Sequence, residues 1–283
     1  MENLTDQEIK NLKIKANDIR KSIIEMLLLA CSGHTAGSLG MADVFAILYF
    51  HTLRHNPKNP LWKDRDRLVL SNGHICPVLY ATMAHAGYFP VEELKTLRKF
   101  GTRLQGHPHR EFLSFVETSS GPLGSGLSQA VGMAIADKID GGIKNIYVIL
   151  SDGEHDEGNT WEAIMLANKE KLSNLIVIVD RNNIQIGGDT EKVMPLGDLK
   201  NKYESFGWFT QEINGHDFFE INNAIFKAKN NKGYPSVIIA HTIPSKGVKE
   251  WEGDYKWHGK APNKAEAEIA LEELNKINNI LHA

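Results

Sequence analysis

Short apolar segments alternate with amphipathic segments along the second half of the chain. The three most apolar segments have few polar positions, which is typical of strands buried on both faces, and the segments between them have helical spacing of apolar residues. Strands separated by helices indicate a parallel sheet with helices on both faces, which is an α/β fold. The predicted strands cover residues 145–150, 174–180 and 236–243, and the predicted helices cover residues 157–172 and 218–230.

The first half has a longer helical pattern. Thr5 or Asp6 can cap a helix that runs to about residue 29. The segment 101–126 contains five glycines and two prolines; because compact domains rarely keep so long an irregular stretch without a use, we expect a functional loop. Further helices are predicted at 41–53 (opened by a break at Gly40), 74–85, 92–99, 126–139 and 264–280, and a strand at 67–70.

Composition excludes several classes of protein. With 42% hydrophobic and 24% charged residues the chain is an ordinary globular protein. The formal net charge of -3 gives no reason to expect binding to nucleic acid or membrane. Cys31 and Cys76 are too few for a disulfide framework and are expected to be reduced. Residues 1–6 are polar and lack the apolar segment of a signal peptide, so a cytoplasmic location is expected.

The most informative residues follow the strand predicted at 145–150. Asp152 follows this strand after one residue, Ser151, at the sheet edge where ligands bind in doubly wound folds. Gly153 would let the backbone approach an anion, and the helix that starts near Glu157 would present free N–H groups to a phosphate. An ordinary strand–helix turn explains Asp152 and Gly153 equally well when they are considered alone.

A second polar group follows the next predicted strand. Asn182 lies 30 residues after Asp152, about one strand–helix–strand unit. A carboxylate, an amide oxygen and a backbone carbonyl would leave room for phosphate oxygens and water around Mg²⁺, which usually shares its coordination with a substrate in this way. The spacing therefore favours a magnesium site over a simple turn.

Glycine–histidine pairs are over-represented. Four occur, at His34, His74, His107 and His216, where random placement of 24 glycines and 12 histidines predicts about one. A glycine before a histidine suits a sharp turn that directs an imidazole into a cleft, where it can bind oxygen atoms and transfer protons.

Together these motifs resemble transketolases. Asp152-Gly153, a spacer of 28 residues and Asn182-Asn183 look like the thiamine diphosphate signature, with Ser151 in place of its usual first glycine. The resemblance spans nearly the whole chain and implies a single thiamine diphosphate-binding domain of the diphosphate type over residues 1–283, with an N-terminal helical region and a terminal helix. The matching blocks, in transketolase order, are residues 32–40, 69–74, 106–108, 118–126 and 257–262.

The resemblance implies a role for each matching residue. Asp152, Asn182 and the carbonyl of Ile184 would hold Mg²⁺, with Ca²⁺ or Mn²⁺ as substitutes, and Gly153 would contact the diphosphate. Glu157 matches a family glutamate near the subunit contact, and is equally well explained as an acid in the first turn of a helix.

The resemblance also implies that histidines bind the cofactor and the sugar and take part in catalysis. His74 and His258 would bond the diphosphate. His34 and His258 would contact the sugar and assist proton transfer, and His107 would lie beside the reacting carbon. His216 is expected to be structural, and no role is assigned to His109 or His155. Backbone groups facing the aminopyrimidine would come from Gly121, Pro122 and Leu123.

The resemblance covers only the first part of a full transketolase. Residues 1–283 do not include the second α/β domain, which in the family provides the carboxylate that activates the cofactor and most arginines that bind sugar phosphate, so this domain is expected on another chain. We therefore expect the diphosphate-binding subunit of a split transketolase. It would transfer a two-carbon ketol unit between sugar phosphates in the pentose phosphate pathway, and only with a separate pyrimidine-binding chain, as a heterotetramer with two copies of each.

Two other functions remain open. The α subunit of a 2-oxo acid dehydrogenase shares the diphosphate motif and would transfer an acyl group to lipoamide instead. A non-catalytic module would bind thiamine diphosphate without activity. The glycine–histidine blocks and residues 121–124 favour transketolase over the first. Five polar residues that a module without activity would not need argue against the second: Asp152, Asn182, His34, His107 and His258.

Overall fold

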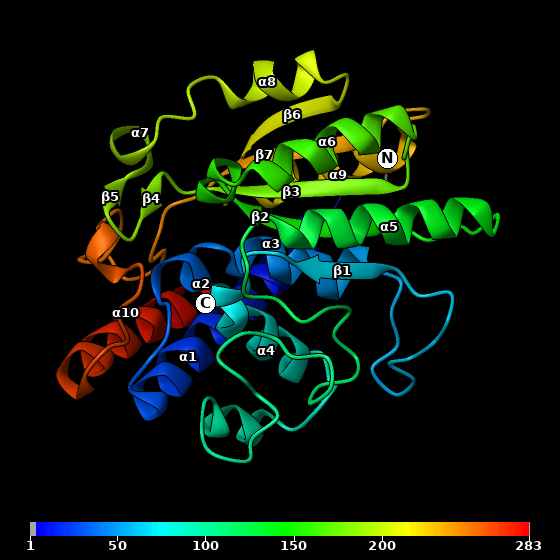
Figure 1. Ribbon diagram of the computed structural model, residues 1–283. Helices are drawn as coiled ribbons and strands as arrows, with labels where there is room; N and C mark the ends of the chain where they lie inside the picture. The colour runs from blue at the N-terminus through cyan, green and yellow to red at the C-terminus, as the bar shows by residue number, and fades with distance from the viewer. Residues whose placement is uncertain (1–3, 283) are drawn as a thin grey trace.

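The centre of the protein is a parallel sheet of five strands. The computed structural model describes residues 4–282, and its strand order is β1-β2-β3-β7-β6, with every neighbouring pair parallel (Figure 1). Four strands confirm the predictions to within two residues, and the fifth was missed. The strands are β1 (Arg67–Leu70), β2 (Ile146–Ser151), β3 (Leu175–Arg181), β6 (Phe209–Asn214) and β7 (Ser236–His241).

Helices cover both faces of the sheet, which confirms the predicted α/β fold (Figure 1). Ile176 and Ile178 of β3 pack into one hydrophobic core, whereas Val177 and Val179 pack into the other, because successive strand side chains point to opposite faces. Helices on the first face are α1 (Asp6–Ala30), α2 (Ala36–Gly40), α3 (Ala42–Ile47), α4 (Cys76–His85), α9 (Phe218–Asn230) and α10 (Lys264–His282). Those on the second are α5 (Ser125–Ile139), α6 (Gly158–Lys169) and α8 (Leu199–Ser205).

Shorter elements connect these layers. A two-stranded hairpin, β4 (Ile184–Gln185) and β5 (Gly188–Asp189), follows β3 and precedes the short helix α7 (Thr190–Val193). A π turn, Leu48–Thr52, extends α3. Turns of 3₁₀ helix occur at Gly73–Ile75, Val91–Thr96, Gly153–Asp156 and Tyr255–Trp257.

One helix prediction is confirmed, and one needs correction. The break predicted at Gly40 is present, because α2 ends at Gly40 and α3 begins at Ala42; the short helix α2 before the break was not predicted. Gly40 lets its helix lie close to the Ile243 backbone, because a Cβ on Gly40 would lie 3.1 Å from the carbonyl oxygen of Ile243. The predicted surface helix 92–99 is a 3₁₀ helix that ends at Thr96 and buries Leu94, and Arg98 beyond it has a φ of 59°.

The elements missed from sequence have weak apolar patterns. β6 lies at the edge of the sheet, and Ile213 is its one buried residue. An edge strand needs few apolar positions, since one side of it is open to solvent. α8 spans Leu199–Ser205, too short for helical periodicity to stand out.

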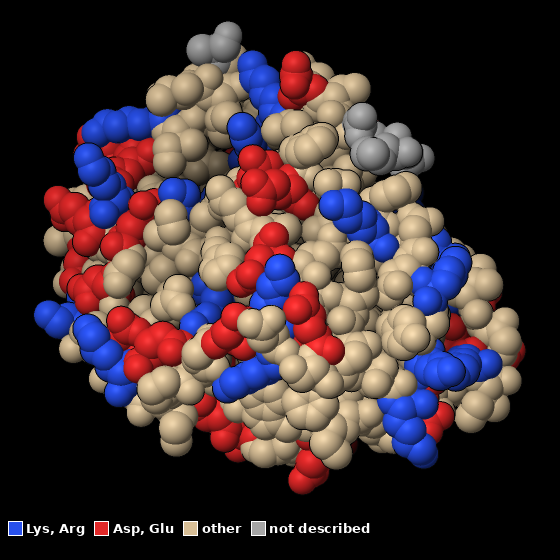
Figure 2. Space-filling view, turned by 90° about the horizontal axis from the view of Figure 1, so that it is seen from above, with Lys and Arg blue, Asp and Glu red and all other residues tan. Residues whose placement is uncertain are grey.

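Charged side chains of both signs are mixed over the face shown in Figure 2, in line with the small net charge. None of the helices within residues 4–282 is long and apolar enough to cross a bilayer.

A buried ionic network joins three parts of the first face. Asp43 of α3 accepts hydrogen bonds from Arg20 of α1 at 2.6 Å and from His216 Nδ1 at 2.7 Å, and His216 Nε2 accepts one from the Ile243 amide. Burial opposes ionisation of Asp43, but Arg20 and His216 outweigh burial and lower its pKa. His216 therefore has the structural contacts expected of it.

Replacing Asp43 by alanine should destabilise the protein by about 3–5 kcal/mol, because Arg20 would remain buried without its partner. The loss is measured by denaturant unfolding at pH 7. Since the folded pKa of Asp43 is lowered, its contribution exists above the ordinary carboxyl pKa and disappears as the pH falls through the folded value. The control is Asp18→Ala, which removes a surface pair with Lys21 at 3.9 Å and should cost less than about 1 kcal/mol. Equal losses in the two variants would contradict this account.

Candidate functional site

A cavity of about 380 Å³ opens at the carboxyl ends of the strands. Its lining comes from segments far apart in the sequence, and ten of the predicted site residues belong to it. They are His34, His74, His107, Gly121, Leu123, Asp152, Gly153, Asn182, Ile184 and His258. The remaining lining residues are Ser151, Gln185, Ile186 and Gly187.

The register of two strands brings the predicted metal ligands together. β2 and β3 pair with Ser151 opposite Asp180, and the Asp152 amide donates to the Asp180 carbonyl at 3.1 Å. Asp152 and Asn182 therefore leave adjacent strands at the same level of the sheet, and both line the cavity.

The carboxylate of Asp152 is almost fully buried and firmly held. Oδ1 accepts the Gly153 amide at 2.8 Å, and Oδ2 accepts the Asn183 amide at 2.8 Å and Arg181 Nη1 at 3.1 Å. Burial raises the pKa of Asp152, while Arg181 and the two amides favour the charged form. Arg181 also pairs with Glu191 at 2.5 Å, so the guanidinium is shared between two carboxylates.

The amide of Asn182 has a fixed orientation. Its Nδ2 donates to Asp180 Oδ2 at 2.9 Å, which identifies the other atom as the oxygen, and this Oδ1 accepts the Ile184 amide at 3.0 Å. Asp180 is itself buried and accepts a hydrogen bond from Thr242. An amide held in this way presents oxygen rather than nitrogen to a neighbouring cation.

The donor atoms fit a hard cation. One carboxylate, one amide oxygen and one carbonyl are the oxygen ligands that Mg²⁺ and Ca²⁺ prefer. Over residues 4–282 there is no group of three or more His, Cys, Asp or Glu side chains placed to hold a metal, and the Asp152 set is of a different kind, since it contains a single acid. None of the lining residues is Lys or Arg, so an anion in the cavity would depend on such a cation for neutralisation.

Three histidines of the cavity lining lie close together. The ring centres of His34 and His74 are 4.9 Å apart, those of His74 and His258 are 5.2 Å apart, and those of His34 and His258 are 5.6 Å apart. The Nδ1 atom of His34 is buried without a hydrogen-bond partner in the described part of the chain. A buried polar atom without a partner is rare in proteins, so a water molecule or another polar group is expected to reach it.

These imidazoles are neutral at physiological pH. Burial, followed by the proximity of His258, Arg98 and His107, lowers the pKa of His34 to about 4. Burial also lowers the pKa of His74, His107 and His258. Each ring can therefore donate one hydrogen bond and accept another at neutral pH.

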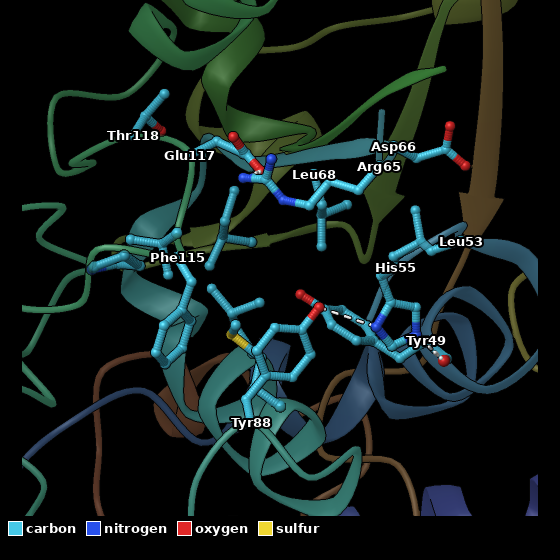
Figure 3. A pocket seen from close by; sticks show the side chains of 15 residues that line it. Tyr49, Leu53, His55, Arg65, Asp66, Leu68, Tyr88, Phe115, Glu117 and Thr118 are labelled. Carbon is cyan, nitrogen blue, oxygen red and sulfur yellow. Dashed lines mark hydrogen bonds and ion pairs between the residues drawn. The ribbon is translucent and has the colours of Figure 1, made fainter. Parts of the chain in front are cut away.

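The loop that carries His107 and residues 121–123 is anchored behind the cavity. Glu117 pairs with Arg65 at 2.7 Å, and its carbonyl accepts Arg110 Nη1 at 2.5 Å. Figure 3 shows a second, much smaller space beneath this loop, where Arg65 meets Glu117 and His55 bonds Tyr88 at 2.9 Å. At about 30 Å³ it has room for a water molecule rather than a substrate.

Two predicted residues lie outside the lining. Pro122 is exposed, and its carbonyl accepts the Ser125 hydroxyl at 2.7 Å, at the start of α5. Glu157 is exposed and precedes α6 as its N-cap. Their predicted contacts with a cofactor remain predictions. Conversely, no sequence pattern singled out Gln185, Ile186 and Gly187, which reach the cavity because the β4–β5 hairpin folds back over it.

Comparison with known families gives a match, over residues 11–275, to the family described as "Transketolase, thiamine diphosphate binding domain". Two curated relatives are similar over almost their whole length. The 6-deoxy-6-sulfo-D-fructose transketolase subunit SqwG of Clostridium sp. (strain MSTE9) is 42% identical over 96% of this chain and 99% of its own. An apulose-4-phosphate transketolase subunit of Phocaeicola vulgatus is 38% identical over 95% of both.

Longer proteins match over part of their length. The transketolase of Pongo abelii is 37% identical over 95% of this chain, which spans 42% of that protein. Among solved structures, transketolase from Campylobacter jejuni aligns with a TM-score of 0.89 and 39% identity, covering 96% of this chain and 43% of that one.

The histidine cluster should make stability depend on pH. Because the folded pKa of His34 is about 4 and its ordinary value is 6.5, the unfolded chain binds more protons between these values, and the free energy of unfolding should fall as the pH falls through this window. His34→Gln should reduce that fall by about 1–3 kcal/mol. Denaturant unfolding between pH 7 and pH 4 measures it, with the exposed His282→Gln as control. Parallel curves for wild type and His34→Gln would show that His34 is not held neutral.

Proposed function

This chain belongs to the transketolase family, as its thiamine diphosphate-binding domain, and on that basis we propose that it is the diphosphate-binding subunit of a two-chain transketolase. The family resemblance and the fold expected from it are confirmed. The proposed enzyme is a transferase that moves a two-carbon ketol unit between sugar phosphates. The observation that carries this proposal is the cavity that joins the Asp152–Asn182 pair to four neutral histidines.

Asp152, Asn182 and the Ile184 carbonyl would hold Mg²⁺, with Ca²⁺ or Mn²⁺ as substitutes. The fixed amide of Asn182 and the absence of Lys and Arg from the lining support a cation at this place. Bound thiamine diphosphate would supply the nucleophilic carbon that the protein's own side chains lack. His74, His258 and Gly153 would bind the diphosphate.

Neutral histidines would accept protons from the sugar hydroxyls and return them. His34 and His258 would each accept a hydroxyl proton at a ring nitrogen and return it, because a neutral imidazole has one free acceptor and one donor. His107, on the anchored loop, would orient the substrate beside the reacting carbon. The low pKa of His34 keeps its acceptor nitrogen free at neutral pH.

A second chain would complete the site. Gly121 and Leu123 line one side of the cavity and would face the aminopyrimidine ring, with Pro122 and Glu157 nearer the partner. The partner would bring the activating carboxylate and the cationic groups that bind sugar phosphate. Two relatives of almost the same length are named as transketolase subunits, which supports a two-chain enzyme, and we propose two copies of each chain.

We propose that residues 1–283 form one domain that acts in the cytoplasm, in carbohydrate metabolism of the pentose phosphate type. Because the two subunit relatives are named for 6-deoxy-6-sulfo-D-fructose and apulose-4-phosphate, a substrate screen should include these ketoses beside pentose phosphates.

Asp152→Ala should abolish Mg²⁺-dependent binding of thiamine diphosphate, measured by calorimetry, with a loss of affinity of about 100-fold or more. The fold should survive, because Arg181 keeps its pair with Glu191. Asp64→Ala removes an exposed aspartate and is the matched control. Equal affinity in Asp152→Ala and wild type would mean that the metal site lies elsewhere.

The full proposal is tested by reconstitution. The purified chain, mixed with a pyrimidine-type transketolase chain, thiamine diphosphate and Mg²⁺, should transfer a ketol unit from a ketose to an aldose phosphate, and neither chain alone should do so. Full activity of this chain alone would contradict the two-chain proposal. Acyl transfer from a 2-oxo acid to lipoamide would instead support the dehydrogenase α subunit, and cofactor binding without turnover would support a non-catalytic module.

A further inference from the structure

A buried carboxylate, Glu154, joins three segments that lead into the cavity. No sequence pattern singled it out. Glu154 belongs to the 3₁₀ turn Gly153–Asp156, directly after β2, and it is completely buried. None of the ion pairs within residues 4–282 includes it. An acid buried without a cation is costly unless hydrogen bonds compensate its charge.

The compensation comes from three different segments. Glu154 Oε1 accepts the Ser71 hydroxyl at 2.5 Å and the Gly124 amide at 2.7 Å, and Oε2 accepts the Ser151 amide at 2.9 Å. Burial raises the pKa of Glu154, while the bonds to Ser71, Gly124 and Ser151 favour the charged form.

Each of these segments leads into the cavity. Ser71 precedes the turn that carries His74, Gly124 follows Leu123, and Ser151 precedes Asp152. His74, Leu123 and Asp152 all line the cavity. A single carboxylate thus fixes the spacing between three of its walls.

The junction is tightly packed. The Ser71 hydroxyl also accepts the Gly126 amide at 3.2 Å, and a Cβ on Gly126 would lie 2.5 Å from Ser71. Gly124 has a φ of 78°, and a Cβ there would lie 2.2 Å from Asn159. These two glycines let the start of α5 approach Ser71 and Glu154, and the close packing leaves little room for another side chain to replace the carboxylate.

Other side chains would not satisfy the same donors. A carboxylate has two acceptor oxygens and no donor, which matches three converging donors. Glutamine offers one oxygen and would turn its NH₂ group toward a backbone N–H. Aspartate is shorter by one methylene, so its oxygens would not reach Ser71 and Gly124 from the same turn.

We propose that Glu154 is a positioning residue of the cofactor site, which holds the His74, Leu123 and Asp152 segments at the separation that thiamine diphosphate requires. This rests on the proposed function, since the cofactor defines that separation. Residues that orient the groups binding a metal or cofactor typically affect its affinity by about 10- to 100-fold.

The test compares Glu154→Gln with wild type, each in complex with a pyrimidine-type transketolase chain, by calorimetry of thiamine diphosphate at saturating Mg²⁺. We expect the dissociation constant to rise about 10-fold or more. Glu268→Gln, on the exposed side of α10, is the charge-matched control and should bind like wild type. Leu274→Ala, a core change in the same helix, should lower the unfolding midpoint without a comparable loss of affinity.

A second readout does not depend on the cofactor. Amide hydrogen exchange at Gly124 and Ser151 should be slow in the wild-type chain and about 10-fold faster or more in Glu154→Gln. Exchange at Val177, in the middle of β3, should stay unchanged. A uniform increase at all three amides would reveal general destabilisation and overturn the proposal.

The outcomes separate the two proposals. If wild type does not bind thiamine diphosphate even in complex with a pyrimidine-type transketolase chain, the proposed function fails. If it binds and Glu154→Gln binds equally well, or if Leu274→Ala loses as much affinity, the positioning role fails alone. Should Glu154→Gln not fold, Ser71→Ala replaces it: we expect its affinity to fall by about threefold or more, and unchanged affinity would overturn the proposal.

Discussion

The parallel pairing of β2 with β3 is the interaction on which the rest of the site depends. With Ser151 opposite Asp180, the two strands end at the same level, and Asp152 and Asn182 emerge side by side at the edge of the sheet. Parallel strands buried on both faces cannot slip by one residue without moving every apolar side chain into the wrong core. The register of the sheet therefore fixes the position of Asp152 relative to Asn182. The loops then place the histidines around these two residues.

Burial makes the chemistry of the cavity unusual. Its histidines are neutral, and none of its lining residues is Lys or Arg, so the described chain provides hydrogen bonds but little positive charge for an anion. Arg181 is committed to Asp152 and Glu191. A diphosphate would thus depend on a divalent cation, and a sugar phosphate on groups from another chain. The lining therefore has acceptor nitrogens but no cationic side chain of its own, which supports the two-chain function that we propose.

The sequence predicted the long elements and the residues that gather at the cavity, and it failed where local pattern carries no signal. Buried strands and long helices were found because apolar periodicity is strong there, whereas β6 was missed because an edge strand buries one residue, Ile213. The break expected at Gly40 does separate α2 from α3, but the sequence did not reveal that this glycine also permits a contact with Ile243, 203 residues later in the chain. Glu154 was overlooked for the same reason: its partners Ser71 and Gly124 are distant in sequence, and a lone glutamate after a strand does not reveal them.

The most direct test of the central claim is to locate the metal. Crystals of the chain grown with thiamine diphosphate and Mn²⁺ should give one anomalous peak per chain, at coordination distance from Asp152, Asn182 and the Ile184 carbonyl and from two oxygens of the diphosphate. A peak at any other place in the protein, or a cofactor bound with its diphosphate away from the ends of β2 and β3, would contradict the account.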